Sequence, residues 1–174
     1  HVHEQRVVHL LAEPAEVRGL EELRRQRAQV AQDGRAVTRL PPVPTAATLR
    51  TALLGFANQH LDHLAEPETI GAARLVTAQA QQFPEEVAEV YQTYVGALED
   101  RLAAWLQQAM RRGLLRHDDP HCAAELLLGM IVGLDFDRQR HLAPHRHAPE
   151  ARAHWAAFAI DSFLRAFAPP SPRS

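Results

Sequence analysis

Aromatic side chains recur on one predicted helix at spacings that suit the wall of a small-molecule pocket. Tyr91, Tyr94, Leu98 and Trp105 follow one another at intervals of three, four and seven residues, which places them on or near one helix face. Pockets between helices are mostly apolar, with a few polar groups that orient the ligand. Because tyrosine combines a large ring with one hydroxyl group, this face predicts a site for a small, mostly apolar or aromatic molecule. The same residues would also suit a solid core, and the sequence leaves both interpretations open.

Histidines are the only candidate metal ligands that cluster in the sequence. His60 and His63 are one helical turn apart and close to Asp62 and Glu66, and three further histidines lie within 141–147. A zinc site needs three or four converging nitrogen, sulfur or carboxylate ligands. None of these spacings matches such a site, and the Glu-x-x-His pairs of carboxylate di-iron bundles are absent. We therefore expect neither a metal ion nor another cofactor, and a metal-binding helical protein remains an alternative hypothesis.

Catalytic motifs are absent from the chain. There is no G-x-S-x-G, P-loop or dinucleotide fingerprint. Cys122, the single cysteine, lies at the first turn of a predicted helix, where the helix dipole could lower the pKa of its thiol. Its neighbours Ala123 and Ala124 begin an apolar run, so we interpret Cys122 as a buried structural residue. The sequence predicts a protein that is not an enzyme.

The composition is that of a globular protein without a strong excess of either charge. The chain has 174 residues and a mass of 19.4 kDa, with 46% hydrophobic and 23% charged residues and a formal net charge of −2. This balance excludes a mainly disordered chain and gives no support to a polyanion-binding surface over the whole molecule. The single cysteine and the lack of a long apolar run favour a cytoplasmic protein with no membrane partner.

Helical periodicity dominates the sequence, so we predict an all-α fold. Two short helices are expected over 7–11 and 17–30. The proline-rich run 40–44 predicts a stiff, extended linker, because proline fixes φ and disfavours helix in the residue before it. The predicted divisions are an N-terminal helical segment with its linker, 1–45, a main domain, 46–168, and a flexible tail, 169–174.

The main domain is predicted to contain about five main helices with clear start and stop signals. Pro67 and Pro84 suit the first turn of a helix, where a missing N–H costs nothing, and Asp119 followed by Pro120 adds an N-cap acid. Gly113 suits the end of the long helix that begins at Pro84. The predicted helices run to 64, from 67 to 80, from 84 to 112, from 120 to 134 and from 150 to 167, with a polar, histidine-rich loop over 135–149.

Four segments occur in an order and spacing that are similar to those of a known family. They are ARLVTAQAQQFPE, a long helix that ends in RRGLLRHDDP, then CAAELLLGMIVG, and the terminal AIDSFLRAF. Over 66–167 the chain resembles the C-terminal domain of TetR-family transcriptional regulators, notably the AefR-like group. The resemblance implies a helical ligand-binding and dimerisation domain whose last two long helices pair across a two-fold axis into a four-helix bundle.

The resemblance also implies where an effector and a second copy of the chain would bind. The pocket would lie between the helices that precede Gly113 and the helix that carries Met130, with Arg74 or Gln79 as the polar anchor. The expected ligand-binding residues are Arg74, Gln79, Tyr91, Tyr94, Leu98, Trp105 and Met130. The expected homodimer interface comprises Leu126, Met130, Gly133, Trp155, Phe158, Ile160 and Phe163.

Residues 1–45 do not match the helix-turn-helix module with which TetR regulators begin. This segment has seven Arg against six acidic residues, whereas a DNA reader concentrates basic charge because phosphate contacts carry most of the affinity. We therefore expect DNA binding only if the full gene has an upstream reader, and whether 1–45 replaces that reader stays open. The leading hypothesis is the ligand-sensing, dimerising part of a transcriptional repressor. The alternative is a protein-interaction module that binds neither ligand nor DNA.

Overall fold

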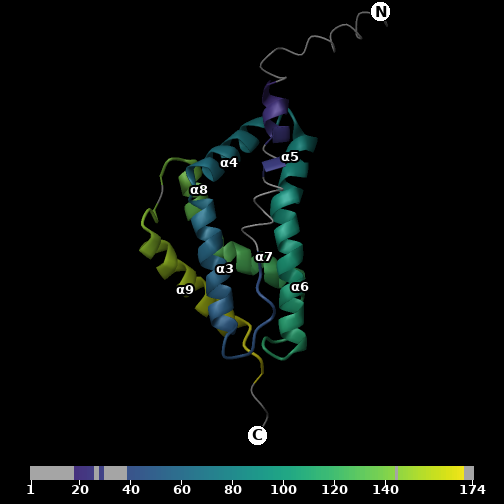
Figure 1. Ribbon diagram of the computed structural model, residues 1–174, viewed down its shortest axis with the longest axis vertical. Coiled ribbons are helices and arrows are strands. Elements are labelled where there is room, and N and C mark those ends of the chain that lie inside the picture. The colour runs from purple at the N-terminus through teal and green to yellow at the C-terminus, as the bar shows by residue number, and fades with distance from the viewer. Residues whose placement is uncertain (1–17, 26–27, 30–38, 144, 171–174) are drawn as a thin grey trace, which may run out of the picture.

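The computed structural model describes residues 18–25, 28–29, 39–143 and 145–170, and this part of the chain consists of helices and their connections, with no strand (Figure 1). The all-α prediction is thereby confirmed. The helix predicted over 7–11 lies outside the described residues, and residues 18–25 are helical as expected. The other elements are α3 (Leu49–Leu64), α4 (Pro67–Gln79), α5 (Pro84–Tyr91), the π-helix η1 (Gln92–Gly96), α6 (Ala97–Arg111), α7 (Pro120–Val132), α8 (Asp135–Arg140) and α9 (Pro149–Ala166).

Proline and aspartate set the helix starts where the sequence indicated them. α4, α5, α7 and α9 each have proline in the first turn. At α7 the carboxylate of Asp119 accepts a hydrogen bond from the backbone N–H of Cys122 at 2.9 Å, which satisfies one of the free donors of the first turn. α6 ends before Gly113, whose φ of 71° glycine adopts at little cost. The predicted starts at Pro67, Pro84 and Pro120 are therefore confirmed.

The core lies where α3 packs along α9 and where α6 packs along α7. The apolar stripe of α3 is buried over its whole length and consists of Leu49, Leu53, Phe56, Ala57, Leu61 and Leu64. Arg50 joins α3 to α9 by two hydrogen bonds, since its Nε and Nη2 donate to the carboxylate of Asp161 at 2.7 and 3.0 Å. The core side chains with no exposed surface include Leu53, Leu102, Leu106, Leu127, Ile131, Ile160 and Phe163.

The long helix that begins at Pro84 is continuous but contains one π-helical turn. α5 passes into η1 and then into α6 without a break. A π turn accommodates an extra residue, which rotates the preceding side chains by about 100° relative to an uninterrupted α-helix. Tyr91 therefore does not share a face with Leu98 and Trp105, contrary to the prediction. It is 57% exposed, whereas Leu98 and Trp105 are 2% and 5% exposed.

α7 ends at Gly133, and the interval that follows is only partly a loop. Gly133 has φ 57° and ψ −152°, and a Cβ there would lie 3.0 Å from Cζ2 of Trp155, so glycine also permits the close approach of α9. The chain then forms α8, with acidic residues in its first turn and arginines in its last, an order that the helix dipole favours. The prediction of a loop over the whole of 135–149 is therefore wrong, because residues 135–140 form α8.

The proline-rich linker is held against α6. Residues 39–45 are non-helical, as predicted. The indole N–H of Trp105 donates to the carbonyl oxygen of Pro41 at 2.7 Å, and Arg112 donates to the carbonyl oxygen of Val43 at 2.9 Å. Leu40 and Val43 pack against the core. A domain boundary at this linker remains a prediction, but the linker itself is part of the packed body.

The N-terminal helical residues 18–25 lie beside the junction of α4 and α5 (Figure 1). A Cβ on Gly19 would lie 3.0 Å from Oε1 of Gln79 and 3.5 Å from Cε2 of Phe83, and Leu23 is 1% exposed. This segment therefore shares buried surface with the helices of the main domain. Within the described ranges, no helix combines the length and the apolar character that a membrane crossing requires.

Candidate functional site

The predicted ligand-binding residues of the long helix lie in three different environments. Leu98 and Trp105 belong to the apolar core, and the N–H of Trp105 is already bonded to Pro41. Tyr91 is exposed to solvent. Only Tyr94, in η1, is half-buried with a polar group directed inward. The structure thus does not bring the four residues together at one surface.

Tyr94 faces His63 of α3 across the interior of the bundle. Their ring centroids are 6.0 Å apart, with the ring planes at 57°. The hydroxyl oxygen of Tyr94 is buried and has no hydrogen-bond partner among the described residues. Burial raises the pKa of Tyr94 to about 12, and the charge of Glu66 adds to this effect while that of Arg101 opposes it. At neutral pH the hydroxyl is therefore a protonated donor without an acceptor.

His60 lies one helical turn before His63 and is buried, with 5% of its surface exposed. Its ring stacks on that of Phe56 at a centroid distance of 5.9 Å. Burial lowers the pKa of His60 to about 4, with a smaller contribution from the charge of His63, so the imidazole is uncharged at neutral pH. Its Nδ1 has no partner within the described part of the chain. Burial of His60 was not predicted, although its place in the apolar stripe, four residues after Phe56, indicates it.

α4 covers this interior without contributing a buried residue. Oε1 of Gln79 is buried and lacks a partner among the residues described. Arg74 instead extends to α8, where its Nη2 and Nε donate to the carbonyl oxygens of Gln139 and Arg140 at 2.6 and 3.1 Å. Of the two predicted polar anchors, Gln79 retains a free acceptor and Arg74 links α4 to α8.

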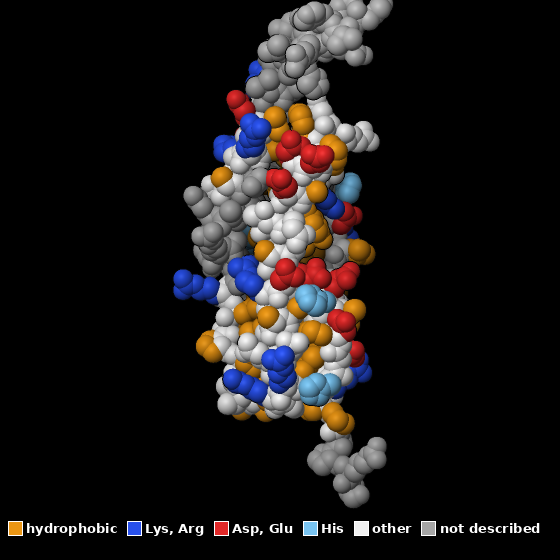
Figure 2. Space-filling model, turned by 90° about the vertical axis from the view of Figure 1, so that its right-hand side faces the viewer, with side chains coloured by type: hydrophobic (Ala, Val, Ile, Leu, Met, Phe, Trp, Pro, Cys, Tyr) orange, Lys and Arg blue, Asp and Glu red, His pale blue; other side chains and the backbone are white. Residues whose placement is uncertain are grey.

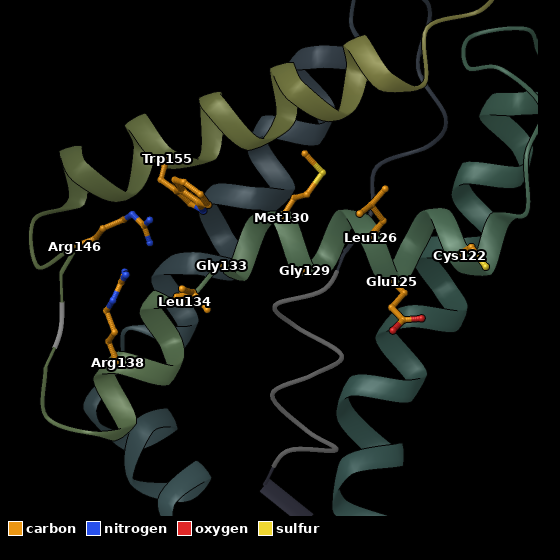
Figure 3. Close-up of a pocket in the computed structure, with 10 residues that line it drawn as sticks. All are labelled: Cys122, Glu125, Leu126, Gly129, Met130, Gly133, Leu134, Arg138, Arg146 and Trp155. Atoms are coloured by element: carbon orange, nitrogen blue, oxygen red, sulfur yellow. The ribbon is translucent and has the colours of Figure 1, made fainter.

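An open groove of about 750 Å³ follows the outer side of α7 and reaches α8 and α9 (Figure 3). Its apolar lining includes Leu126, Met130 and Trp155. Arg146 lies over the ring of Trp155 at 4.0 Å, and Figure 3 shows the side chains of Arg138 and Arg146 converging at this end of the groove. Glu125 and Cys122 line the opposite end. The groove is therefore apolar along its length, basic at one end and acidic at the other.

The predicted dimer residues divide between this surface and the core. Leu126 and Phe158 are 49% and 58% exposed, and Met130, Gly133 and Trp155 line the groove. Leu134, which the sequence analysis did not select, is 66% exposed and lines it as well. Ile160 and Phe163 have no exposed surface, because they contact the other helices of their own chain, and they have no area to offer a partner.

The reactive and metal-binding candidates gain no support from their surroundings. Cys122 is exposed, contrary to the predicted burial, because it lies on the open side of the first turn of α7. The negative charge of Asp119 raises the pKa of its thiol, which disfavours the thiolate. Within the described ranges, no group of three or more His, Cys, Asp or Glu side chains could hold a metal ion.

The face formed by α5 and α6 carries charges of both signs (Figure 2). Glu85 and Glu86 lie in the first turn of α5, and Glu99 and Asp100 lie in the first turn of α6, while Arg111 lies in its last turn. Glu85 and Glu86 at the start of this continuous helix and Arg111 at its end complement the helix dipole. The face shown in Figure 2 is not a continuous basic surface of the kind that binds a nucleic-acid backbone.

One family model matches the chain. It is that of the AefR-like transcriptional repressor C-terminal domain, and the match extends over residues 51–169. None of the curated proteins matches the sequence.

Two solved structures share the fold. A protein described as a TetR-family transcriptional regulator from Mesorhizobium loti has a TM-score of 0.74 at 22% identity, over 86% of this chain and 73% of that chain. The flavonoid-responsive regulator FrrA has a TM-score of 0.70 at 25% identity, over 84% of this chain and 74% of that chain.

Proposed function

The chain belongs to the TetR family of transcriptional regulators, with an AefR-like C-terminal domain, and we propose that it is the part of such a regulator that senses a small effector and forms the dimer. TetR-family regulators act as dimers that bind DNA and small effectors, and their fold is generally non-enzymatic. The effector and the dimer surface are proposed below from the residues of this chain.

The effector proposal rests on the interior bounded by α3, α4 and η1. Two buried polar atoms there, Nδ1 of His60 and the hydroxyl of Tyr94, have no partner among the described residues. α4 has no buried residue, so its apolar side chains retain surface for a ligand. We propose that a small, mostly apolar or aromatic molecule binds here, and the name of the neighbour FrrA, which is flavonoid-responsive, supports an aromatic one.

Thermal unfolding in the presence of flavone tests this proposal. A ligand that binds the folded state alone raises Tm by an amount that grows with the logarithm of its concentration relative to Kd. We expect flavone to raise the Tm of the native chain, and Tyr94→Ala to reduce that increase while the protein remains dimeric. An unchanged Tm at saturating flavone would argue against an aromatic effector.

The dimer proposal rests on the groove and on the exposed apolar side chains beside it. Leu126, Leu134 and Phe158 expose large apolar areas on or next to this surface. We propose that α7 pairs with its copy in antiparallel orientation across a two-fold axis. In such an interface, a residue that contacts a second residue of the copy is matched by the same contact with the two chains exchanged. That arrangement brings the acidic end of the groove, at Glu125, toward the basic end of its copy, at Arg138 and Arg146.

DNA binding stays a proposal for the full regulator. The family match begins at residue 51 and leaves the preceding residues outside it. Residues 1–45, with seven Arg against six acidic residues, do not supply the concentrated positive charge of a reader. An interaction module without ligand remains the second candidate, because the same groove would accept an apolar helix of another protein. A monomer in solution that binds no aromatic compound would favour it.

A further inference from the structure

Two buried polar atoms of α3 and η1 could form hydrogen bonds with an effector and so restrict its chemistry. They are Nδ1 of His60 and the hydroxyl oxygen of Tyr94, and neither has a hydrogen-bond partner among the described residues. His60 is 5% exposed, so bulk water does not satisfy its nitrogen. Buried polar groups in folded proteins are bonded to protein, ordered water or a ligand. A molecule that enters this interior therefore finds one nitrogen and one hydroxyl ready to bond.

His63 connects the helix face that carries His60 to Tyr94. It follows His60 by three residues and so lies on the same face of α3. Its ring is 6.0 Å from that of Tyr94. Because the π turn rotates Tyr91 into solvent, Tyr94 is the tyrosine that meets this face of α3. His60 and Tyr94 therefore belong to the two elements, α3 and η1, that meet at His63.

The surroundings of the two groups favour an uncharged ligand. The imidazole of His60 is neutral and the phenol of Tyr94 is protonated at neutral pH, both because of burial. Glu66 and Arg101 act on Tyr94 in opposite directions. Arg74, the arginine of α4, donates to the carbonyl oxygens of α8. A buried ligand charge would find no free counter-charge in this set.

We propose that the effector is an uncharged aromatic compound with a hydroxyl group, which hydrogen-bonds to Nδ1 of His60 and to the hydroxyl of Tyr94. This inference rests on the proposed effector-sensing function and specifies the chemistry of its ligand. A hydroxyl both donates and accepts, so it can bond to a neutral imidazole nitrogen in either tautomer and to a phenol at the same time. The aromatic remainder would pack against the apolar side chains of α4.

A matched pair of probes, 2-naphthol and naphthalene, tests the proposal by equilibrium dialysis at pH 7. The two molecules share a ring system and differ in one hydroxyl group. We expect the full chain to bind 2-naphthol about tenfold more tightly than naphthalene, since two neutral hydrogen bonds are added. Tyr94→Phe and His60→Leu should each reduce this preference several-fold and leave naphthalene binding in place. Tyr91→Phe, which removes an exposed hydroxyl from the same helix, should leave both affinities unchanged.

The outcomes separate this inference from the proposed function. Equal binding of both probes by the native chain would overturn the hydroxyl assignment and leave an apolar effector site standing. A preference for 2-naphthol that survives in Tyr94→Phe and in His60→Leu would overturn the assignment of these two residues. Binding of neither probe would overturn both the inference and the effector proposal. Because Tyr94→Phe removes one oxygen atom only, its result stands even where His60→Leu destabilises the fold.

Discussion

The indole nitrogen of Trp105 donates a hydrogen bond to the carbonyl oxygen of Pro41, 2.7 Å away. This bond joins α6 to the proline-rich linker and uses the one polar group that Trp105 could have offered to a ligand. Arg112, the residue that follows α6, donates to the carbonyl oxygen of Val43 at 2.9 Å. The linker is therefore fastened at two points, at Trp105 in α6 and at Arg112, the residue after α6.

Trp105→Phe should release this linker. The substitution removes a hydrogen bond and part of a buried ring, and we expect the free energy of unfolding to fall by about 1–3 kcal/mol. Trypsin should then cleave after Arg39 faster than in the native chain, which electrophoresis and mass spectrometry can follow. Trp155→Phe is the matched control, because the N–H of Trp155 donates to Ile131 on α7 and not to the linker. Equal cleavage rates at Arg39 in both variants would contradict the role given to Trp105.

His60 should make the stability of the protein depend on pH in the mildly acidic range. The pKa of His60 is near the ordinary histidine value of 6.5 in the unfolded chain and about 4 in the folded protein, mainly because of burial. Between these values the unfolded state binds more protons, so stability is lost as the pH falls from about 6.5 to 4. A difference of this size corresponds to roughly 3 kcal/mol at the acidic end. Urea denaturation at several pH values measures it.

The contribution of His60 is isolated by comparison with variants. In His60→Leu the slope of unfolding free energy between pH 6.5 and 4 should be shallower than in the native chain. His121→Gln, which replaces an exposed histidine, should leave the slope nearly unchanged. A slope that is identical in all three proteins would show that His60 does not titrate as a buried group.

The chain should form a two-fold homodimer through the groove surface. Light scattering at micromolar concentration should give about twice the chain mass of 19.4 kDa. Phe158→Asp should shift the mass toward the monomer, because Phe158 is 58% exposed and a charge there would be buried by a partner. Leu142→Asp is the control: Leu142 is 79% exposed on the loop after α8, away from the groove lining, and should leave the dimer intact. A monomeric native chain at this concentration would contradict the dimer.

Charge pairing across the two-fold axis should specify the register of that dimer. Glu125→Arg and Arg138→Glu should each weaken association, since each places like charges opposite one another. The double variant should recover part of the loss, with a coupling of about 1 kcal/mol in a double-mutant cycle measured by sedimentation. Additive losses without recovery would show that the acidic and basic ends of the groove do not meet.

Residues 1–174 by themselves should not bind duplex DNA with sequence selectivity at physiological salt. The formal net charge is −2, and residues 1–45 hold only one more Arg than they have acidic residues, so few phosphates can be neutralised. Fluorescence anisotropy with a pool of random duplexes, followed by sequencing of the bound fraction, measures this. Enrichment of one sequence at 150 mM salt would assign a reader to this chain.

The family and the helical order of the main domain could be predicted from the sequence, because the signals involved are local. A proline at 67, 84 or 120 excludes helix before it and suits the first turn after it, whatever lies across the bundle. The apolar stripe of α3 repeats at the helical period, and each of its members is buried. The order and spacing of these elements carried the resemblance that the family match confirms.

The chemistry of the interior depends on contacts between elements that are distant in sequence. One π turn leaves Tyr91 in solvent while Tyr94 faces inward, and no periodic pattern in the sequence marks the position of that turn. The indole N–H of Trp105 bonds to the linker and is not available to a ligand, because Pro41, 64 positions earlier, supplies the acceptor. His60 is neutral because helices from other parts of the chain exclude water from it, and Cys122 is exposed because none covers it. Helix starts follow from neighbouring residues in the chain, whereas burial, and with it protonation and hydrogen bonding, is decided only when the helices pack.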